Sequence, residues 1–102
     1  MDATKRFYGA VLTVLGHELS ERGPYLFFDE LYFSDDGPAT TGLHIAFQAA
    51  DRDAVDAFYN AALAAGGRDN GRPGLRTDYS PNYYAAFIVD PDGNNVEAVY
   101  LG

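Results

Sequence analysis

The chain carries the same sequence pattern twice, 51 residues apart. Residues 7–16 read FYGAVLTVLG, and residues 58–67 read FYNAALAAGG. Extending the comparison gives seven identities over the fifteen positions 2–16 set against 53–67. Self-similarity of this kind indicates that one supersecondary unit is used twice. The repeat constrains the fold strongly, because the elements around the second copy predict those expected around the first.

The second copy lies within a complete series of predicted elements. Residues 43–49, LHIAFQA, favour a strand. Asp51 suits the N-cap of a helix that ends at Gly66-Gly67, and its apolar stripe is formed by Val55, Phe58, Ala62 and Ala65. A short strand and a glycine- and proline-bearing loop over 70–82 follow, and residues 83–100 predict a hairpin around the turn PDGN.

The first copy begins at its helix. Residues 2–15 have helical spacing of apolar side chains, and strands are predicted within 17–22 and 25–34 around Gly23-Pro24. We therefore predict an α+β fold of tandem βαβββ modules in one domain, 1–102, with helices on the convex face of a cup-shaped mixed sheet. Residues 1–36 form a first module that lacks its first strand, and residues 43–102 form a complete second module. An unpaired sheet edge would result, which favours a homodimer.

Composition narrows the classes of partner. The 102 residues carry a formal net charge of −8 without a basic cluster, so nucleic acid and anionic membranes are not expected as partners. No apolar run reaches the roughly 20 residues of a membrane span. The absence of cysteine excludes disulfides and thiolate sites, and it fits a cytoplasmic location.

Strand alternation brings a histidine and carboxylates to one face of the sheet. In 43–48, Leu43, Ile45 and Phe47 point to the helices, which leaves His44 on the other face. The same alternation leaves Glu97 opposite the helices, and it groups Glu30 with Phe28 and Tyr32. These side chains either bind a divalent metal or form a hydrogen-bonded pair on a solvated face.

The runs GLHIAFQAADRDAVDAFYNAALAAGG and YSPNYYAAFIVDPDGNNVEAVY resemble the second module of the vicinal oxygen chelate superfamily, the glyoxalase/bleomycin-resistance/extradiol-dioxygenase group. The resemblance covers residues 43–100 closely and 2–16 well. It implies a cup holding a divalent metal (Fe, Mn, Ni, Co or Zn), with ligands from the first and last strands of each module. By position the implied ligands are His44, Glu97 and Glu30, and Glu97 is also the candidate catalytic residue. Ser80 stands where a relative is expected to have a histidine.

Further side chains are candidates for contact with a small-molecule ligand. Arg76 either clamps a carboxylate of the substrate or pairs with one of the many acids. Tyr79, Tyr83 and Tyr84 can line an aromatic wall, although at least one of them must pack in the core, and we select Tyr79 and Tyr84 as substrate-binding residues.

Three functions are compatible with these features. The first is a metal-dependent lyase, isomerase or dioxygenase that acts on a small oxygenated substrate. The second is a metal-free protein that binds a small, antibiotic-like molecule. The third is a truncated module that serves mainly self-association.

Overall fold

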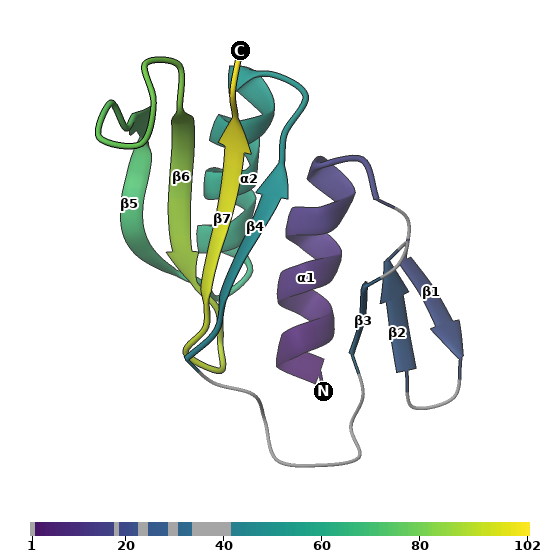
Figure 1. Ribbon diagram of the computed structural model, residues 1–102. Coiled ribbons are helices and arrows are strands. Elements are labelled where there is room, and N and C mark those ends of the chain that lie inside the picture. Colours follow the sequence, from purple (N-terminus) through teal and green to yellow (C-terminus); the bar gives the residue numbers. More distant parts are fainter. Residues whose placement is uncertain (1, 18, 23–24, 29–30, 34–41) are drawn as a thin grey trace.

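The computed structural model describes residues 2–17, 19–22, 25–28, 31–33 and 42–102 (Figure 1). Two helices and seven strands lie within these residues. In chain order they are α1 (Asp2–Val14), β1 (Leu19–Arg22), β2 (Tyr25–Phe28), β3 (Leu31–Phe33), β4 (His44–Gln48), α2 (Arg52–Ala64), β5 (Arg68–Leu75), β6 (Tyr84–Val89) and β7 (Asn95–Tyr100). Neither helix is long and apolar enough to cross a membrane.

The strands after residue 42 form a four-stranded sheet of order β4-β7-β6-β5 (Figure 1). β4 runs parallel to β7, whereas β6 is antiparallel to both of its neighbours. Together with α2, these strands make one complete βαβββ unit. β1, β2 and β3 form an antiparallel meander of that order, so the succession of α1 and three strands repeats that of α2 and its three strands.

The predicted α+β class is confirmed, as are both helices, the strand over 43–49 and the terminal hairpin. The predicted lack of a first strand in the first module is not tested by these elements and stays a prediction. The loop predicted over 70–82 is wrong for its first part, because β5 continues to Leu75 through Gly71, Pro73 and Gly74. Register shifts at Asp69/Gly71 and Gly71/Gly74 accommodate these residues. A strand at the end of a sheet tolerates proline, since its outer N–H groups have no partner strand.

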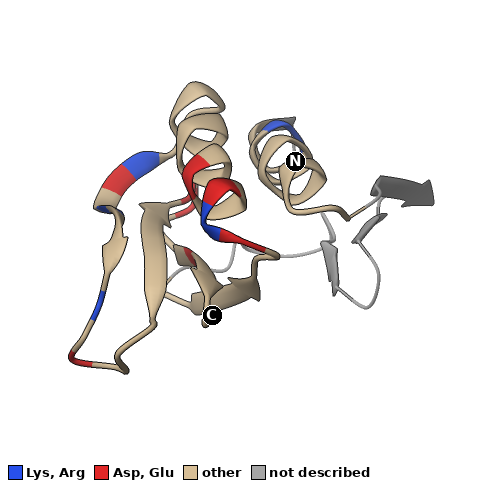
Figure 2. Cartoon of the chain, turned by 90° about the horizontal axis from the view of Figure 1, so that it is seen from above, with Lys and Arg blue, Asp and Glu red and all other residues tan. Residues whose placement is uncertain are grey.

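Both helices lie on the same side of the four-stranded sheet (Figure 2). Their apolar stripes meet the inward side chains of β6 and β7 in one core, formed by Phe7, Tyr8, Val11, Leu12, Ala49, Val55, Phe58, Ala62, Ala86, Ile88, Val96 and Ala98. Asp51 caps α2 as predicted, and its carboxylate accepts a hydrogen bond of 2.7 Å from the Ala54 N–H. Among the described residues, no helix lies on the opposite side of this sheet.

A buried hydrogen bond ties α1 to the turn between β6 and β7. The Tyr8 hydroxyl donates to Asp90 Oδ2 over 2.5 Å, and both residues are buried. Asp90 Oδ1 accepts hydrogen bonds from the N–H groups of Asp92 and Asn94, and these bonds hold the turn between the two strands. Burial and this bond raise the pKa of Tyr8 well above its ordinary range. The helix of the first repeat therefore completes the core of the second.

Candidate functional site

The side chains of the four-stranded sheet are distributed between its two faces as alternation predicts. Val96 and Ala98 lie in the helix-covered core, whereas Glu97 and Val99 of the same strand point to the other side. On that side Ala85, Phe87 and Val99 form a second apolar cluster with Tyr83 packed against it. We call the surface formed by His44, Tyr83, Ala85, Phe87, Glu97 and Val99 the Glu97 face.

Glu97 is the buried charged group at the centre of this face. Its Oε1 lies 2.8 Å from Nε2 of His44, and its Oε2 accepts a short hydrogen bond from the Tyr83 hydroxyl. The Glu97 side chain is only 3% exposed, while that of His44 is 56% exposed. His44 therefore lies between the carboxylate and solvent, and the two strands bring together the predicted pair.

The tautomer of His44 follows from its partner. An ionised carboxylate only accepts hydrogen bonds, so Nε2 of a neutral His44 carries the proton and Nδ1 bears the lone pair. Among the described residues, Nε2 is the only ring nitrogen of His44 with a hydrogen-bond partner. Nδ1 is consequently available to a molecule that approaches from solvent.

Two tyrosines lie beside Glu97: Tyr83 contacts its carboxylate, and Tyr79 packs against Tyr83. Burial, followed by the hydrogen bond to Glu97 and its charge, raises the pKa of Tyr83 to about 12. The ring of Tyr79 packs edge-on against that of Tyr83, at 4.8 Å between centroids, and Tyr79 is 64% exposed. The structure thus places the predicted Tyr79 next to the site, with Tyr83 as the residue that contacts Glu97.

Arg76 also lies beside the Glu97 face. Its guanidinium carbon is 5.4 Å from the centroid of the Phe87 ring. Phe87 is directly opposite Glu97 in the β6–β7 register, and its ring is 6.3 Å from that of His44. Phe87 therefore separates a cation on one side from the His44–Glu97 pair on the other.

Tyr84 is the candidate that the structure does not bring to this site. Its ring packs against the helix-side core, and its hydroxyl donates to Asp56 Oδ1 of α2 over 2.7 Å. The hydrogen bond to Asp56, with burial as a second cause, raises the pKa of Tyr84. Tyr84 is the tyrosine that serves packing, as alternation requires of one of the three.

The described residues supply fewer potential metal ligands than a metal centre needs. Among the described residues, no group of three or more His, Cys, Asp and Glu side chains is arranged to hold a metal ion. His44 and Glu97 supply an imidazole and a carboxylate, and the predicted ligand Glu30 lies outside the described residues. Both oxygens of Glu97 already accept hydrogen bonds.

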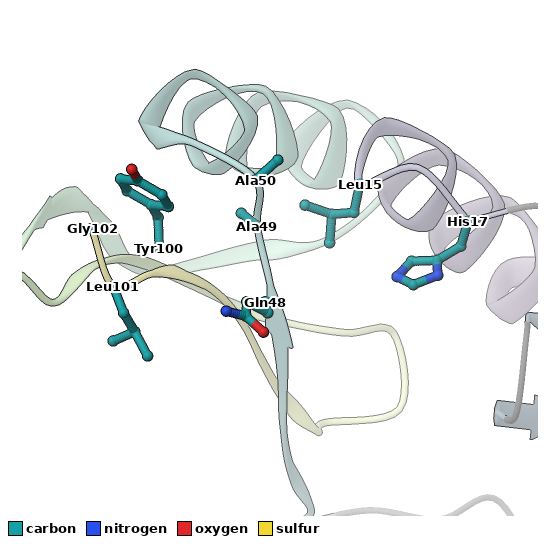
Figure 3. Close-up of a pocket in the computed structure, with 8 residues that line it drawn as sticks. All are labelled: Leu15, His17, Gln48, Ala49, Ala50, Tyr100, Leu101 and Gly102. Carbon is teal, nitrogen blue, oxygen red and sulfur yellow. The ribbon is translucent and has the colours of Figure 1, made fainter.

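A pocket of about 490 Å³ opens at one end of β4 and β7, away from Glu97 (Figure 3). Its lining comprises Leu15, His17, Gln48, Ala49, Ala50, Tyr100, Leu101 and Gly102. Figure 3 shows Leu15 and His17 entering from the end of α1, and no carboxylate side chain among the labelled residues. Because this lining contains no acidic side chain, we place the candidate chemistry on the Glu97 face.

Sequence reasoning did not single out Phe87, and it listed Tyr83 only among three candidate wall residues. The signal for both was the alternation of β6, in which Tyr84, Ala86 and Ile88 face the helices and the odd-numbered residues face away. The contact between the Tyr83 hydroxyl and Glu97 depends on the β6–β7 register, which alternation alone does not give.

Comparison with known proteins gives a consistent result. The family profile described as Glyoxalase/Bleomycin resistance protein/Dioxygenase superfamily matches residues 1–98. A glyoxalase/bleomycin resistance protein from Albidiferax ferrireducens T118 is 29% identical, with a TM-score of 0.84 over 98% of this chain and 88% of that one. The comparison with curated proteins found no match.

Two more distant solved structures share the fold. A glyoxalase-related enzyme from Fulvimarina pelagi is 22% identical, with a TM-score of 0.69 over 98% of this chain and 79% of that chain. A lactoylglutathione lyase from Agrobacterium tumefaciens is 24% identical, with a TM-score of 0.62 over 97% and 84%, respectively.

Proposed function

Because this chain belongs to the Glyoxalase/Bleomycin resistance protein/Dioxygenase superfamily, we propose that it binds a small oxygenated molecule on the Glu97 face and transfers a proton there. One observation carries the proposal: a solvent-exposed imidazole, His44, is hydrogen-bonded at 2.8 Å to a carboxylate that is itself buried. A buried acid that holds an exposed base is a recurrent arrangement in general acid–base catalysis.

Each residue of the pair has a separate task in this proposal. His44 Nδ1, on a side chain that is 56% exposed, takes a proton from the bound molecule, for instance from a carbon next to a carbonyl group. Glu97 fixes the tautomer of His44 and stabilises the imidazolium that forms, because a negative charge 2.8 Å away favours the protonated ring. Tyr83 holds the second oxygen of Glu97, so the carboxylate cannot rotate away. Glu97, predicted as the catalytic residue, acts here through His44.

The apolar cluster around the pair supports a bound organic molecule. Ala85, Phe87 and Val99 form a buried apolar cluster next to the exposed His44, and apolar surroundings with a few polar groups are typical of small-molecule sites. Because this cluster already excludes water from one side of Glu97, it strengthens the interaction between Glu97 and a protonated His44.

The described residues do not complete a site for the divalent metal that many members of such a superfamily use. Two side chains, His44 and Glu97, have suitable donor atoms, but no third joins them in the part of the chain that the structure describes. No step of the proposed reaction therefore passes through a metal.

A proton-transfer site can be tested without knowing the natural substrate. Hydroxyacetone in D₂O serves as a probe, and the incorporation of deuterium next to its carbonyl is followed by proton NMR. We expect the wild type to accelerate exchange and His44→Ala to lose roughly 10²-fold or more of the acceleration. Glu97→Gln is expected to lose most of it as well, since an amide nitrogen donates to Nε2 and reverses the tautomer.

His17→Ala is the matched control, because His17 is the other histidine of the chain and lies in the pocket away from Glu97. It should exchange the probe at the wild-type rate. If the wild type leaves hydroxyacetone unexchanged, or if His44→Ala retains full activity, the proton-transfer proposal is wrong.

A metal-dependent lyase, isomerase or dioxygenase is the second candidate, favoured by the donor types of His44 and Glu97. It requires stoichiometric Fe, Mn, Ni, Co or Zn in protein purified without chelators. It also requires a rise in unfolding temperature with one of these ions that His44→Ala removes and His17→Ala keeps.

Self-association is the third candidate, favoured by the pairing of β4. Among the described residues β4 pairs only with β7, and Leu43 just before it is 48% exposed. A strand with one free edge is a template for another copy of the chain. A homodimer joined at this edge is compatible with either form of chemistry.

A further inference from the structure

We propose that Arg76 forms an anion subsite that receives the carboxylate of a small organic acid, which extends from Arg76 toward His44 across the accessible edge of Phe87, a residue that is 9% exposed. The inference rests on the Glu97 face being the ligand site, and it names the class of ligand. Arg76 lies directly after β5, and its backbone is fixed by hydrogen bonds from its N–H to Tyr83 O (2.7 Å) and from the Tyr79 N–H to its carbonyl (3.0 Å).

The guanidinium has a preformed position. It lies 5.4 Å from the Phe87 centroid, and Nη2 donates to the Arg72 carbonyl over 2.5 Å. A guanidinium has five N–H donors in a planar fork, so this single bond leaves most of its capacity for a ligand. A cation–π contact with the Phe87 ring also helps to hold the guanidinium in this position.

Two glycines make room for this arrangement. A Cβ on Gly71 would lie 2.8 Å from Phe87 Cδ2 and 3.2 Å from Arg76 Nη2, and Gly71 has a φ of 151°. A Cβ on Gly74 would lie 3.1 Å from Arg76 Nη1. The irregular strand NGRPGL thus has no side chain at the two positions where one would displace the arginine or the ring beneath it.

The absence of a protein carboxylate at Arg76 points to an external anion. The chain has 15 acidic residues against 7 basic ones, yet among the described residues none lies within ion-pair distance of Arg76. A carboxylate matches the guanidinium fork in two parallel hydrogen bonds. Glu97, on the far side of Phe87, repels a second negative charge and so orients an acid with its carboxylate toward Arg76.

The chemical class of the ligand follows from Phe87, which lies between Arg76 and the His44–Glu97 pair. Phe87 is 6.3 Å from the His44 ring and 5.4 Å from the Arg76 guanidinium, so one small molecule on Phe87 reaches both. Its middle must be apolar or aromatic to match the accessible edge of the Phe87 ring. Its other end meets His44.

The experiment compares phenylacetate with phenylacetamide, which differ in charge but hardly in shape. Both are titrated at neutral pH into the wild type and into Arg76→Met, with binding followed by protein NMR. We expect the acid to bind the wild type on the order of tenfold tighter than the amide, as a charge-assisted bidentate pair predicts. Arg76→Met should bind both equally weakly.

Two further variants show whether the preference for the acid is due to the position of Arg76, and not to the net charge of the protein or to misfolding of a variant. Arg68→Met, at the opposite end of β5, removes the same charge and should keep the preference for the acid. Gly74→Ala keeps the charge but displaces the guanidinium, and it should reduce the preference severalfold. Equal affinity of the wild type for acid and amide, or a preference that survives in Arg76→Met, overturns the subsite.

This outcome is distinct from failure of the proton-transfer proposal. Exchange of hydroxyacetone tests the role of His44, whereas the preference for phenylacetate over its amide tests the role of Arg76. An inactive wild type that still prefers the acid in an Arg76-dependent manner supports the subsite and refutes only the proton transfer.

Discussion

The hydrogen bond from Tyr83 to Glu97 can be removed with little other change by Tyr83→Phe. The bond joins a neutral donor to a carboxylate that is 3% exposed and that has two hydrogen-bond partners, so its loss leaves a buried oxygen without one. Hydrogen bonds to charged groups contribute about 1.5–3 kcal/mol. Because Tyr83 is itself half-buried, water can partly replace it, and we expect the lower part of this range, ~1.5 kcal/mol.

The expected destabilisation is large enough to measure. For a domain of this size, 1 kcal/mol lowers the unfolding temperature by about 4–8 °C, so Tyr83→Phe should unfold about 6–12 °C below the wild type. Tyr79→Phe is the matched control. Tyr79 is 64% exposed, and its hydroxyl has no hydrogen-bond partner among the described residues. Its loss should change the free energy of unfolding by less than about 0.5 kcal/mol.

Alkaline pH gives a second, independent signature of the same bond. The pKa of Tyr83 is raised to about 12 in the folded protein, compared with 10.0 as its ordinary value. The unfolded chain therefore loses this proton first, and the stability that Tyr83 contributes is complete below pH 10 and lost as the pH rises toward 12. Tyr83→Phe should remove part of the decline, whereas Tyr79→Phe should not.

The assay is urea unfolding of the three proteins at neutral pH and at several alkaline pH values, followed by circular dichroism. Equal stability of Tyr83→Phe and Tyr79→Phe at neutral pH would refute the claim that the hydroxyl supports Glu97. If the stability of Tyr83→Phe falls at alkaline pH as much as that of the wild type, the link between the raised pKa of Tyr83 and the stability of the fold is refuted as well.

Three other outcomes are expected. Gly67→Ala should destabilise the fold by about 1–3 kcal/mol in urea unfolding, because its Cβ would lie 2.6 Å from both Ile88 and Phe7. Gly9→Ala, in α1 with no atom within 4 Å of the added Cβ, should instead stabilise it by about 0.5–1 kcal/mol. Sedimentation should find a homodimer that Ala46→Lys on the β4 edge weakens; a wild-type monomer would contradict pairing at that edge.

The repeat made the two helices predictable, because each copy carries the helical spacing of apolar residues and a glycine exit. Alternation made the two faces of β4 and β7 predictable, since the side-chain period of a strand is two. The path of residues 70–75 was not predictable in this way. Glycine and proline there indicate a turn by local preference, but pairing with β6 and two register shifts hold the segment in the sheet.

The candidate site was predictable as a face and not as a set of contacts. Alternation assigned His44 and Glu97 to one side of the sheet, and the structure places them 2.8 Å apart. Alternation could not decide whether Tyr83 or Tyr84 lies at the site. It does not show which of these two adjacent residues is the first to face the helices at the start of β6. The structure resolves this through Asp56 of α2, which binds the hydroxyl of Tyr84 and fixes that side chain among the helices.

The distance between His44 and Glu97 depends on the register of a parallel pair. Ala46, not His44, is directly opposite Glu97, so the imidazole reaches along the strand by two positions to meet the carboxylate. Side chains in a diagonal relation are within reach only when at least one is long or aromatic. A histidine at position 46 would lie nearest to the carboxylate, whereas position 44 leaves space above Ala46 and keeps the ring at the edge of the apolar cluster. The same offset brings His44 close to Phe87, and this contact is what places the proton-transfer pair and the proposed anion subsite under one ligand.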